Sequence, residues 1–278
     1  MNVILNLSWT VTCKGHTKIW LPLPIQNFHQ KVIQISKPKG IKKDIKSKLF
    51  HYWYLETNNQ MQIQTNVKLR LNNISKYKDD TKVSRFLSDN NLLLIKKIKS
   101  FASKFKSPKE IYTWIIEKIK FPKDLSKYLK NLNWTESAYA VFKKRTGECA
   151  GKSLLFVACC RAIRIPARIV NGYFLKEGEI ALFDSKFNER SLELHHWAEF
   201  YDGNFWVPVD CSLAQENKKE FFGTFDDYRV IISKDMNFKL YNDDIVPFLQ
   251  IGELKPKNLK NANLSLKLEV RKDGRSRF

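Results

Sequence analysis

Apolar and polar residues alternate over much of the first 73 positions, and this period of two is typical of strands that bury one face. The alternation is clearest in VILNLSWTVTC (3–13) and MQIQTNVKLRLNN (61–73). Between them lie KIWLPLP (18–24) and FHYWYLETNN (50–59), which we also expect to be strands. Strong helix signals are absent here, so the pattern predicts a small antiparallel β unit.

The pattern changes near residue 80, where apolar residues begin to recur with helical spacing. LLLIKKIKSFASKF (92–105) has an apolar stripe with lysines between its members. Ser107-Pro108, followed by Glu110, is typical of a helix start with serine as N-cap and proline at the first helical position. Two helices are therefore expected in this region.

The segment RTGECAGKSLLFVACC (145–160) has a cysteine between a glycine-containing turn and an apolar run. The apolar spacing predicts a helix, with Cys149 at or next to its start. The unpaired N–H groups and the positive dipole end of a helix N-terminus both favour thiolate, which is the reactive form of cysteine. By itself Cys149 would more often be a small buried hydrophobe, so the reactive interpretation requires a base nearby.

Strand signals return after this helix. The expected strands are IPARIVNGYF (165–174), HHWAEFY (195–201), NFWVPVDCS (204–212), DYRVIIS (227–233) and LSLKLEV (264–270), with a short helix over 137–145 and loops over 129–134 and 176–193. A β unit, then helices, a cysteine-headed helix and further strands predict an α+β fold. We divide the chain into a β-rich domain over 1–80 and a second domain over 81–278.

A base and a carboxylate are found in the expected hairpin. Asp202-Gly203 predicts a two-residue turn between the strands, so residues whose numbers sum to about 405 should face each other. His195 and Asp210 meet this condition, and the carboxylate could hold the imidazole in one tautomer. Cys149, His195 and Asp210 would then be nucleophile, base and orienting group, in that chain order.

Neighbouring residues have plainer interpretations. Asp210 alone would usually be a turn or cap residue. His196 is the alternative base, but it falls on the opposite strand face from His195. Gly147 is expected to serve the turn before Cys149. We expect Arg161 and Arg168 to be structural, although Arg168 could present a charge to a cleft.

These segments together resemble the transglutaminase-like superfamily of papain-fold cysteine enzymes. The resemblance rests on Gly147 to Cys149, Arg161 to Arg168, His195-x-Trp197-x-Glu199 and Trp206 to Asp210. It extends to FFGTFDDYRVIIS (221–233) in bacterial members, and the β unit with WLPLP is similar to a region that precedes the core in some of them. It implies a cysteine-headed helix packed on an antiparallel sheet, preceded by a small β-rich domain.

The resemblance also implies an activity, namely acyl transfer through a thioester on protein or peptide amide bonds. The acceptor could be water, giving a peptidase or amidase, or an amine, giving protein-glutamine transamidation. The Cys149 N–H would help to stabilise the oxyanion, and Trp134 is a candidate for the second donor. No cofactor is needed, and no loop typical of a calcium site is visible.

Composition leaves two other classes open. The chain of 278 residues has 49 Lys and Arg against 28 Asp and Glu, a formal net charge of +21. A basic surface could attract nucleic acid, but no nucleic-acid-binding motif is visible, so this partner is not favoured. A non-catalytic binding or scaffolding module on the same fold is the other alternative, and the complete set of Cys149, His195 and Asp210 speaks against it.

The five cysteines, Cys13, Cys149, Cys159, Cys160 and Cys211, form neither a disulfide framework nor a zinc pattern. No apolar run has the length of a transmembrane helix, and the N-terminus does not resemble a signal peptide. We therefore expect a cytoplasmic protein. The sequence indicates neither its oligomeric state nor the reason for its charge.

Overall fold

The computed structural model describes residues 1–72, 75–130, 136–175, 180–184, 189–190, 194–224, 229–242, 245–256 and 262–272. The chain splits into two compact units. Unit 1 comprises Met1–Asn73, Asn171–Leu194 and Asp226–Phe278, and unit 2 comprises Ile74–Val170 and His195–Phe225.

These units differ from a division of the linear sequence at residue 80. The strand β16 (Ala262–Lys272) pairs antiparallel with β1 (Asn2–Cys13) from Val3–Lys272 to Cys13–Ala262. This pairing joins the two ends of the chain in unit 1. A division into consecutive domains cannot represent such a pairing, because it depends on residues more than 240 positions apart.

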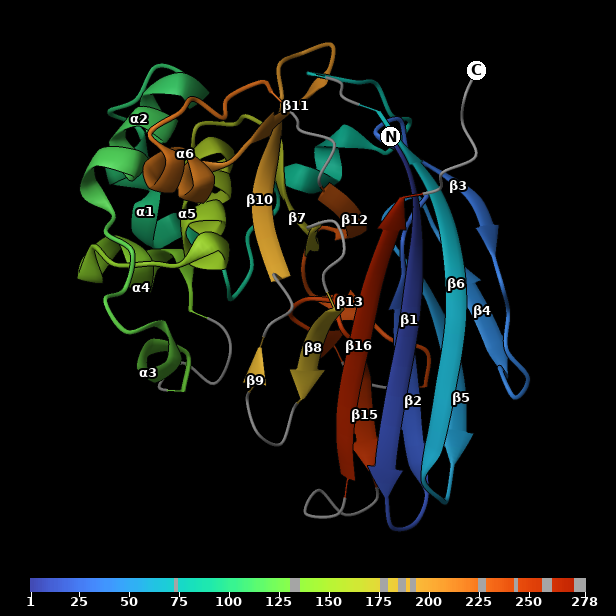
Figure 1. Cartoon of the computed structure of the whole chain (residues 1–278). Helices are drawn as coiled ribbons and strands as arrows, with labels where there is room; N and C mark the ends of the chain where they lie inside the picture. The colour runs from blue at the N-terminus through green and yellow to red at the C-terminus, as the bar shows by residue number, and fades with distance from the viewer. Residues whose placement is uncertain are drawn as a thin grey trace. The chain divides into compact units, whose positions relative to one another are not determined.

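Unit 1 is built from two antiparallel sheets, with orders β3-β6-β1-β16-β8-β9 and β15-β2-β5-β4, and a two-stranded piece, β13-β14. In Figure 1, β16, β1 and β6 run side by side. The remaining bounds are β2 (Thr17–Leu23), β3 (Gln30–Ile35), β4 (Lys43–Lys46), β5 (His51–Thr57), β6 (Met61–Leu71), β8 (Ile180–Asp184), β9 (Glu189–Arg190), β12 (Arg229–Lys234), β13 (Phe238–Lys239), β14 (Ile245–Val246) and β15 (Glu253–Pro256).

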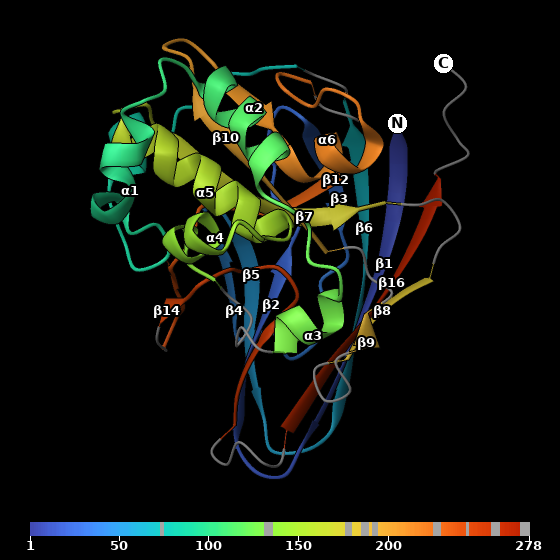
Figure 2. The ribbon, with the colours of Figure 1, turned by 90° about the vertical axis from the view of Figure 1, so that its left-hand side faces the viewer.

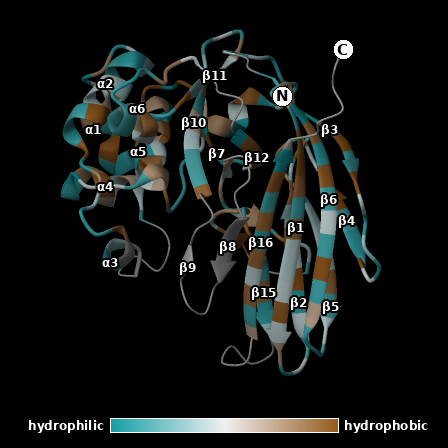
Figure 3. Ribbon diagram, in the orientation of Figure 1, coloured by the Kyte–Doolittle hydropathy of each residue, from teal (hydrophilic) through white to brown (hydrophobic). Residues whose placement is uncertain are grey.

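Alternate burial along the strands confirms the period of two in the sequence. Along β1, Val3, Leu5, Leu7, Trp9 and Val11 are buried and their neighbours are more exposed. The same alternation is visible as changing colour along the strands in Figure 3. The buried face forms the apolar core of unit 1, together with the matching residues of β6 and β16.

One prediction for unit 1 is wrong. Residues 176–193 were expected to be a loop, but Ile180–Asp184 form β8 and pair with β16. Its short apolar stretch becomes a strand through a distant partner, and no local period indicates it. The short strands β3 and β4 likewise lie in segments without a clear alternating pattern.

Unit 2 contains the helices. They are a 3₁₀ turn, η1 (Val83–Leu87), and α1 (Ile95–Ala102), α2 (Pro108–Lys118), α3 (Leu125–Lys130), α4 (Ala138–Lys144), α5 (Cys149–Ala162) and α6 (Cys211–Asn217). Its sheet consists of β11 (Trp206–Val209), β10 (Leu194–Tyr201) and the first part of β7 (Ala167–Phe174). β7 runs on past residue 170 into unit 1, where it lies beside β12.

Helix α5 is the central helix of unit 2 and contacts α1, α2, α4 and α6 (Figure 2). Every residue from Ala150 to Arg161 is buried. The sequence pattern indicated one apolar face, whereas the helix is enclosed on all sides, as its nearly uniform apolar composition permits. Such a helix gives Cys149, at its first position, a rigid support.

The helix starts follow the sequence closely. The Ser107 side chain accepts a hydrogen bond from Glu110 N (3.3 Å), and Glu110 Oε2 accepts one from Lys106 N (2.9 Å). The predicted capping arrangement of α2 is therefore confirmed. Two details differ, since α3 extends to Lys130 inside an expected loop, and α6 was not indicated by any pattern.

Candidate active site

The first turn of α5 is capped by the residue before the cysteine. Glu148 is the N-cap, and its carboxylate accepts hydrogen bonds from Ala150 N (2.7 Å) and Gly151 N (2.9 Å). These bonds satisfy two of the amides that a helix start leaves unpaired. Cys149 is thus the first helical residue, as the sequence predicted.

Two glycines allow this helix start to lie close to α4. A Cβ atom on Gly147 would be 2.8 Å from Val141 Cγ1, and one on Gly151 would be 2.9 Å from Val141 Cγ2. Neither glycine has a positive φ. Gly147 was expected to serve a turn conformation, but its role is to permit close packing against Val141.

The hairpin that holds the other two candidate residues has a different register from the predicted one. Glu199 pairs with Pro208 and Tyr201 with Trp206, so facing residues sum to 407 and not to 405. The connection is longer than a two-residue turn, because Asp202 Oδ1 accepts bonds from Asn204 N (2.9 Å) and Phe205 N (2.8 Å). His195 and Asp210 are therefore diagonal neighbours and do not face each other directly.

His195 and Asp210 are nevertheless in contact. His195 Nε2 lies 2.5 Å from Asp210 Oδ2. The His195 ring is stacked on Trp197 of the same strand face, with 6.0 Å between centroids and 22° between planes. The other oxygen of Asp210 accepts bonds from Ser212 N and Leu213 N, both at 2.9 Å, and so caps α6. Asp210 is both a helix cap and the partner of His195.

Cys149 lies beside the start of β10. The backbone of His196 is hydrogen-bonded to the Cys149 thiol, and Ser153 Oγ donates to His196 O (3.2 Å). The first turn of α5 therefore packs against the strand at the position of the two histidines. Cys149 is half-buried as a residue, with its sulfur in the buried part, and its thiol donates to Glu148 Oε2 at 3.2 Å.

The net effect of these surroundings on the pKa of the Cys149 thiol is opposite to the one expected for a helix N-terminus. Burial first, and then the charge and hydrogen bond of Glu148, raise the pKa of the Cys149 thiol well above its usual value. The Glu148 carboxylate already accepts hydrogen bonds from the amides of the helix start. Their positive potential therefore stabilises this carboxylate and not a Cys149 thiolate. These surroundings therefore favour the neutral thiol over the thiolate.

A buried lysine completes the charges of the site. Lys152, one turn after Cys149, is 0% exposed, and its Nζ donates to Gln215 Oε1 at 2.5 Å. Burial lowers the pKa of Lys152, while the charges of Cys211, Cys149 and Asp210 oppose this shift. Its place inside an apolar run with helical period was the available signal in the sequence.

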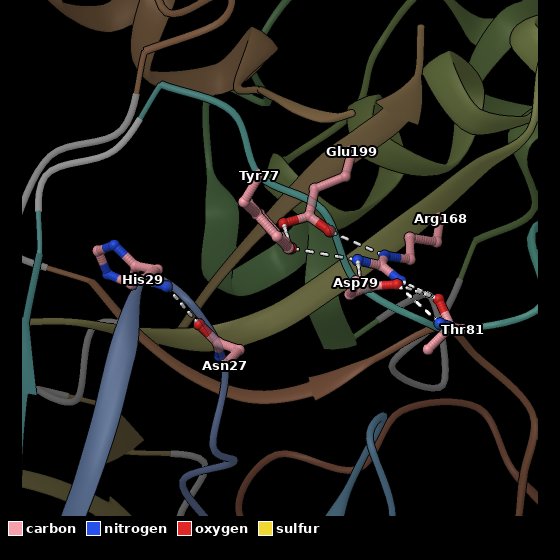
Figure 4. Close-up of polar contacts among 7 residues, drawn as sticks. All are labelled: Asn27, His29, Tyr77, Asp79, Thr81, Arg168 and Glu199. Atoms are coloured by element: carbon pink, nitrogen blue, oxygen red, sulfur yellow. Dashed lines mark hydrogen bonds and ion pairs between the residues drawn. The ribbon is translucent and has the colours of Figure 1, made fainter. Parts of the chain in front are cut away.

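Arg168 forms a buried network (Figure 4). Its guanidinium bonds Glu199 Oε2 (2.8 Å), Asp79 Oδ2 (2.6 Å), and the hydroxyls of Tyr77 (3.1 Å) and Thr81 (3.2 Å). Arg168 is 0% exposed, so it presents no charge to a cleft. It joins β7 and β10 to the segment at 77–81, which confirms the structural interpretation.

Other predicted features have plain outcomes. Arg161 is buried and donates to Ala167 O (2.7 Å) and Ser88 O (2.8 Å), as expected of a structural residue. Trp134, the candidate oxyanion donor, lies outside the described residues.

Within the described part of the chain, no group of three or more His, Cys, Asp or Glu side chains could hold a metal ion. None of the described helices is long and apolar enough to span a bilayer.

Residues 95–211 match the model of the transglutaminase-like superfamily. This segment is a transglutaminase-like core. The core runs from the start of α1 to the first residue of α6, so it contains Cys149, His195 and Asp210. The fold is accordingly α+β, with a core of this family and a β-rich N-terminal region.

One similar solved structure supports this fold, and a second has a lower similarity. A protein from Cytophaga hutchinsonii, described as a candidate cysteine protease, is similar with a TM-score of 0.64 and 15% identity, over 100% of this chain and 92% of the other. The periplasmic domain of TgpA from Pseudomonas aeruginosa, bound to ethylmercury, gives a TM-score of 0.39 and 16% identity, over 74% of this chain and 75% of the other. No curated protein matches the sequence.

Proposed function

We propose that the transglutaminase-like core catalyses acyl transfer through a thioester on Cys149, acting on amide bonds of proteins or peptides. His195 is the general base and Asp210 orients it. The observation that supports this most strongly is the contact of His195 Nε2 with Asp210 Oδ2 at 2.5 Å, beside the start of the cysteine-headed helix. A carboxylate on one ring nitrogen holds the imidazole so that the other can accept a proton.

The proposed reaction has two halves. In the first, His195 Nδ1 takes the thiol proton as the Cys149 sulfur attacks the carbonyl carbon of the amide. The C–N bond then breaks, and the imidazolium returns this proton to the leaving amine. In the second half, water or a second amine attacks the thioester and loses its proton to His195, and the sulfur leaves with a proton. The products are an acid or a new amide.

The neutral resting thiol fits this order of events. Burial and Glu148 raise the pKa of Cys149, so a preformed thiolate is not the starting state. Proton transfer to His195 accompanies the attack, which makes the position of the base essential. Asp210 is 3% exposed in its side chain, so its charge acts on the imidazolium with little screening by solvent.

The oxyanion needs at least one donor near the sulfur. Glu148 caps Ala150 N and Gly151 N, and the preceding amide, Cys149 N–H, is not among the amides it engages. We assign this N–H as one oxyanion donor, because it belongs to the nucleophile itself and points out of the helix start.

The test compares wild type with Cys149→Ala in a cell lysate containing a primary-amine probe. Mass spectrometry records both probe-labelled and newly cleaved proteins. Cys149-dependent labelling would indicate transamidation, and Cys149-dependent cleavage would indicate hydrolysis. Cys13→Ala is the matched control, because Cys13 is also partly exposed and lies in unit 1. Equal labelling and cleavage profiles for wild type and Cys149→Ala would contradict the proposed enzymatic activity and favour a non-catalytic binding module.

A further inference from the structure

Two opposite charges flank Cys149 on α5. Glu148 precedes it, and its Oε2 atom is 3.2 Å from the Cys149 sulfur. Lys152 follows three positions later, so it lies on the same side of the helix one turn on. The catalytic arrangement proposed above requires neither residue, and both therefore need an explanation.

A glutamate is more than the helix start needs. Serine, threonine, asparagine or aspartate would cap α5 equally well. The longer carboxylate of Glu148 reaches both Ala150 N and Gly151 N and also accepts a hydrogen bond from the Cys149 thiol. It thus adds a full negative charge at the sulfur, where a thiolate would be repelled.

Burying the charged Lys152 side chain costs free energy, and its Nζ has both a polar and an aromatic partner. Its side chain is 0% exposed, and it donates to Gln215 Oε1, with the Phe121 ring centroid 5.3 Å from Nζ. Gln215 is fixed in turn, since its Nε2 donates to Ile116 O (2.8 Å) and Ile119 O (3.0 Å). Within the described residues, no carboxylate forms an ion pair with Lys152. Its charge interacts with Cys211, Cys149, Asp210 and Glu148, so the cysteine is one of the groups on which it acts.

We propose that Glu148 and Lys152 are positioning residues that control how readily Cys149 loses its proton. Glu148 holds the thiol proton in the resting state, and Lys152 favours the thiolate once His195 begins to take that proton. The inference deepens the proposed function and rests on it. The thiol stays protected until a substrate is aligned, and the buried cation then stabilises the charge that develops on sulfur.

The pKa shifts support both directions. Burial raises the pKa of Cys149 most, and the charge and hydrogen bond of Glu148 raise it further; burial lowers the pKa of Lys152, and the charges of Cys211 and Cys149 oppose that shift. The other titratable groups near this cluster are Asp210 and Cys211 at the start of α6, whose charges act on Lys152, and Tyr128 on α3, on which the charge of Glu148 acts. His195 on β10 contacts Asp210, and Tyr112 on α2 is affected by Cys211 and Asp210. These groups remain unchanged in the variants below.

The experiment measures the pH profile of Cys149 alkylation by iodoacetamide in the full chain, read by mass spectrometry on the peptide that contains Cys149. Glu148→Gln keeps an oxygen for the cap and loses the charge. We expect its alkylation midpoint to fall by about one pH unit, which means a roughly tenfold faster reaction below the midpoint. Lys152→Met should raise the midpoint, and Lys152→Arg should restore it in part.

Matched controls have the same changes in net charge away from the site. Glu117→Gln and Lys118→Met alter exposed side chains on α2 and should leave the midpoint unchanged. Thermal unfolding of each variant identifies any that fail to fold, and Lys152→Arg provides a second test if Lys152→Met does not fold. Midpoints of Glu148→Gln and Lys152→Met that equal the wild-type value, or that move in the same direction, overturn the inference.

The two proposals can fail separately. If the midpoints move as expected but Cys149→Ala leaves the lysate profile unchanged, the acyl-transfer function fails and the control of the thiol stands. If Cys149-dependent turnover is present and the midpoints do not move, the function stands and the role of Glu148 and Lys152 is wrong.

Discussion

The carboxylate of Asp210 contacts His195 through one oxygen and caps a helix through the other. Oδ2 lies 2.5 Å from His195 Nε2, and Oδ1 accepts the N–H groups of Ser212 and Leu213. The two cap bonds hold the Asp210 carboxylate in the orientation in which its other oxygen contacts His195. Because the two oxygens make different contacts, variants can separate the contribution of Asp210 to stability from its contribution to activity.

Asp210→Asn should preserve the fold and remove most activity. The amide oxygen can still cap α6, but an NH₂ group at the position of Oδ2 donates to His195 and selects the wrong tautomer. We expect turnover to fall by about 10²-fold to 10⁴-fold. Asp210→Ala should lose the same activity and, in addition, about 1 kcal/mol of unfolding free energy. Turnover and urea unfolding measure the two effects, and an active Asp210→Asn would contradict the assignment.

Gly151→Ala should destabilise unit 2, although alanine normally stabilises a helix relative to glycine. The added Cβ would lie 2.9 Å from Val141 Cγ2, and the surrounding helices cannot move apart without cost. We expect a loss of about 1–3 kcal/mol. In the double variant Gly151→Ala/Val141→Ala the clash is removed, so the two losses should not add. Additive losses in urea unfolding would show that Val141 is not the obstacle.

The hairpin shows how far the sequence alone could predict the site. His195 and Asp210 were expected to face each other at a sum of 405, and the observed register is 407. The contact survives because a shift of two residues keeps every side chain on its face. The error comes from Asp202, whose side chain bonds two backbone amides and forms a longer loop than a dipeptide signal indicates.

Most of the features that the sequence could not predict depend on interactions between segments that are distant along the chain. The alternating pattern located β1, β6 and β16, but β8 becomes a strand only through its pairing with β16. The start of α5 at Cys149 was likewise predictable from local spacing. The raised pKa of its thiol was not, because it depends on the side-chain conformation of Glu148 and on burial by elements far along the chain.

Replacement of Arg168 should be among the most destabilising changes in unit 2. Arg168 and Glu199 are both 0% exposed, so Arg168→Met leaves the Glu199 carboxylate buried without its cation. The expected cost is about 3–5 kcal/mol in urea unfolding. Arg168→Lys should also destabilise, since one ammonium cannot reach Glu199, Asp79 and Thr81 together.

The double variant Arg168→Met/Glu199→Met tests the cause. With both charges gone, no uncompensated charge is buried, and the loss should be smaller than the sum of the two single losses. A double loss equal to that sum would mean that Arg168 stabilises through packing on Trp206, whose ring centroid is 3.8 Å from its guanidinium carbon.

Two glutamates of unit 1 should give opposite pH dependences of stability. Burial raises the pKa of Glu253, on β15, to about 7, whereas Lys42, Tyr54 and His16 lower the pKa of Glu56 to about 2. The folded state thus holds a proton on Glu253 between about pH 4.5 and 7, where the unfolded chain has lost it. Stability falls as pH rises through this window.

Glu253→Gln removes that loss. Its unfolding free energy should equal that of wild type below about pH 4.5 and exceed it by up to about 3 kcal/mol above pH 7, which is the pKa difference converted to free energy. Glu56→Gln should behave in the opposite way. Its native pKa is depressed, so wild type should be more stable at neutral pH, and this advantage should disappear as pH falls from about 4.5 through 2. Urea unfolding of both variants between about pH 2 and 8 measures these differences, and a Glu253→Gln difference independent of pH would show that folding leaves the pKa of Glu253 unchanged.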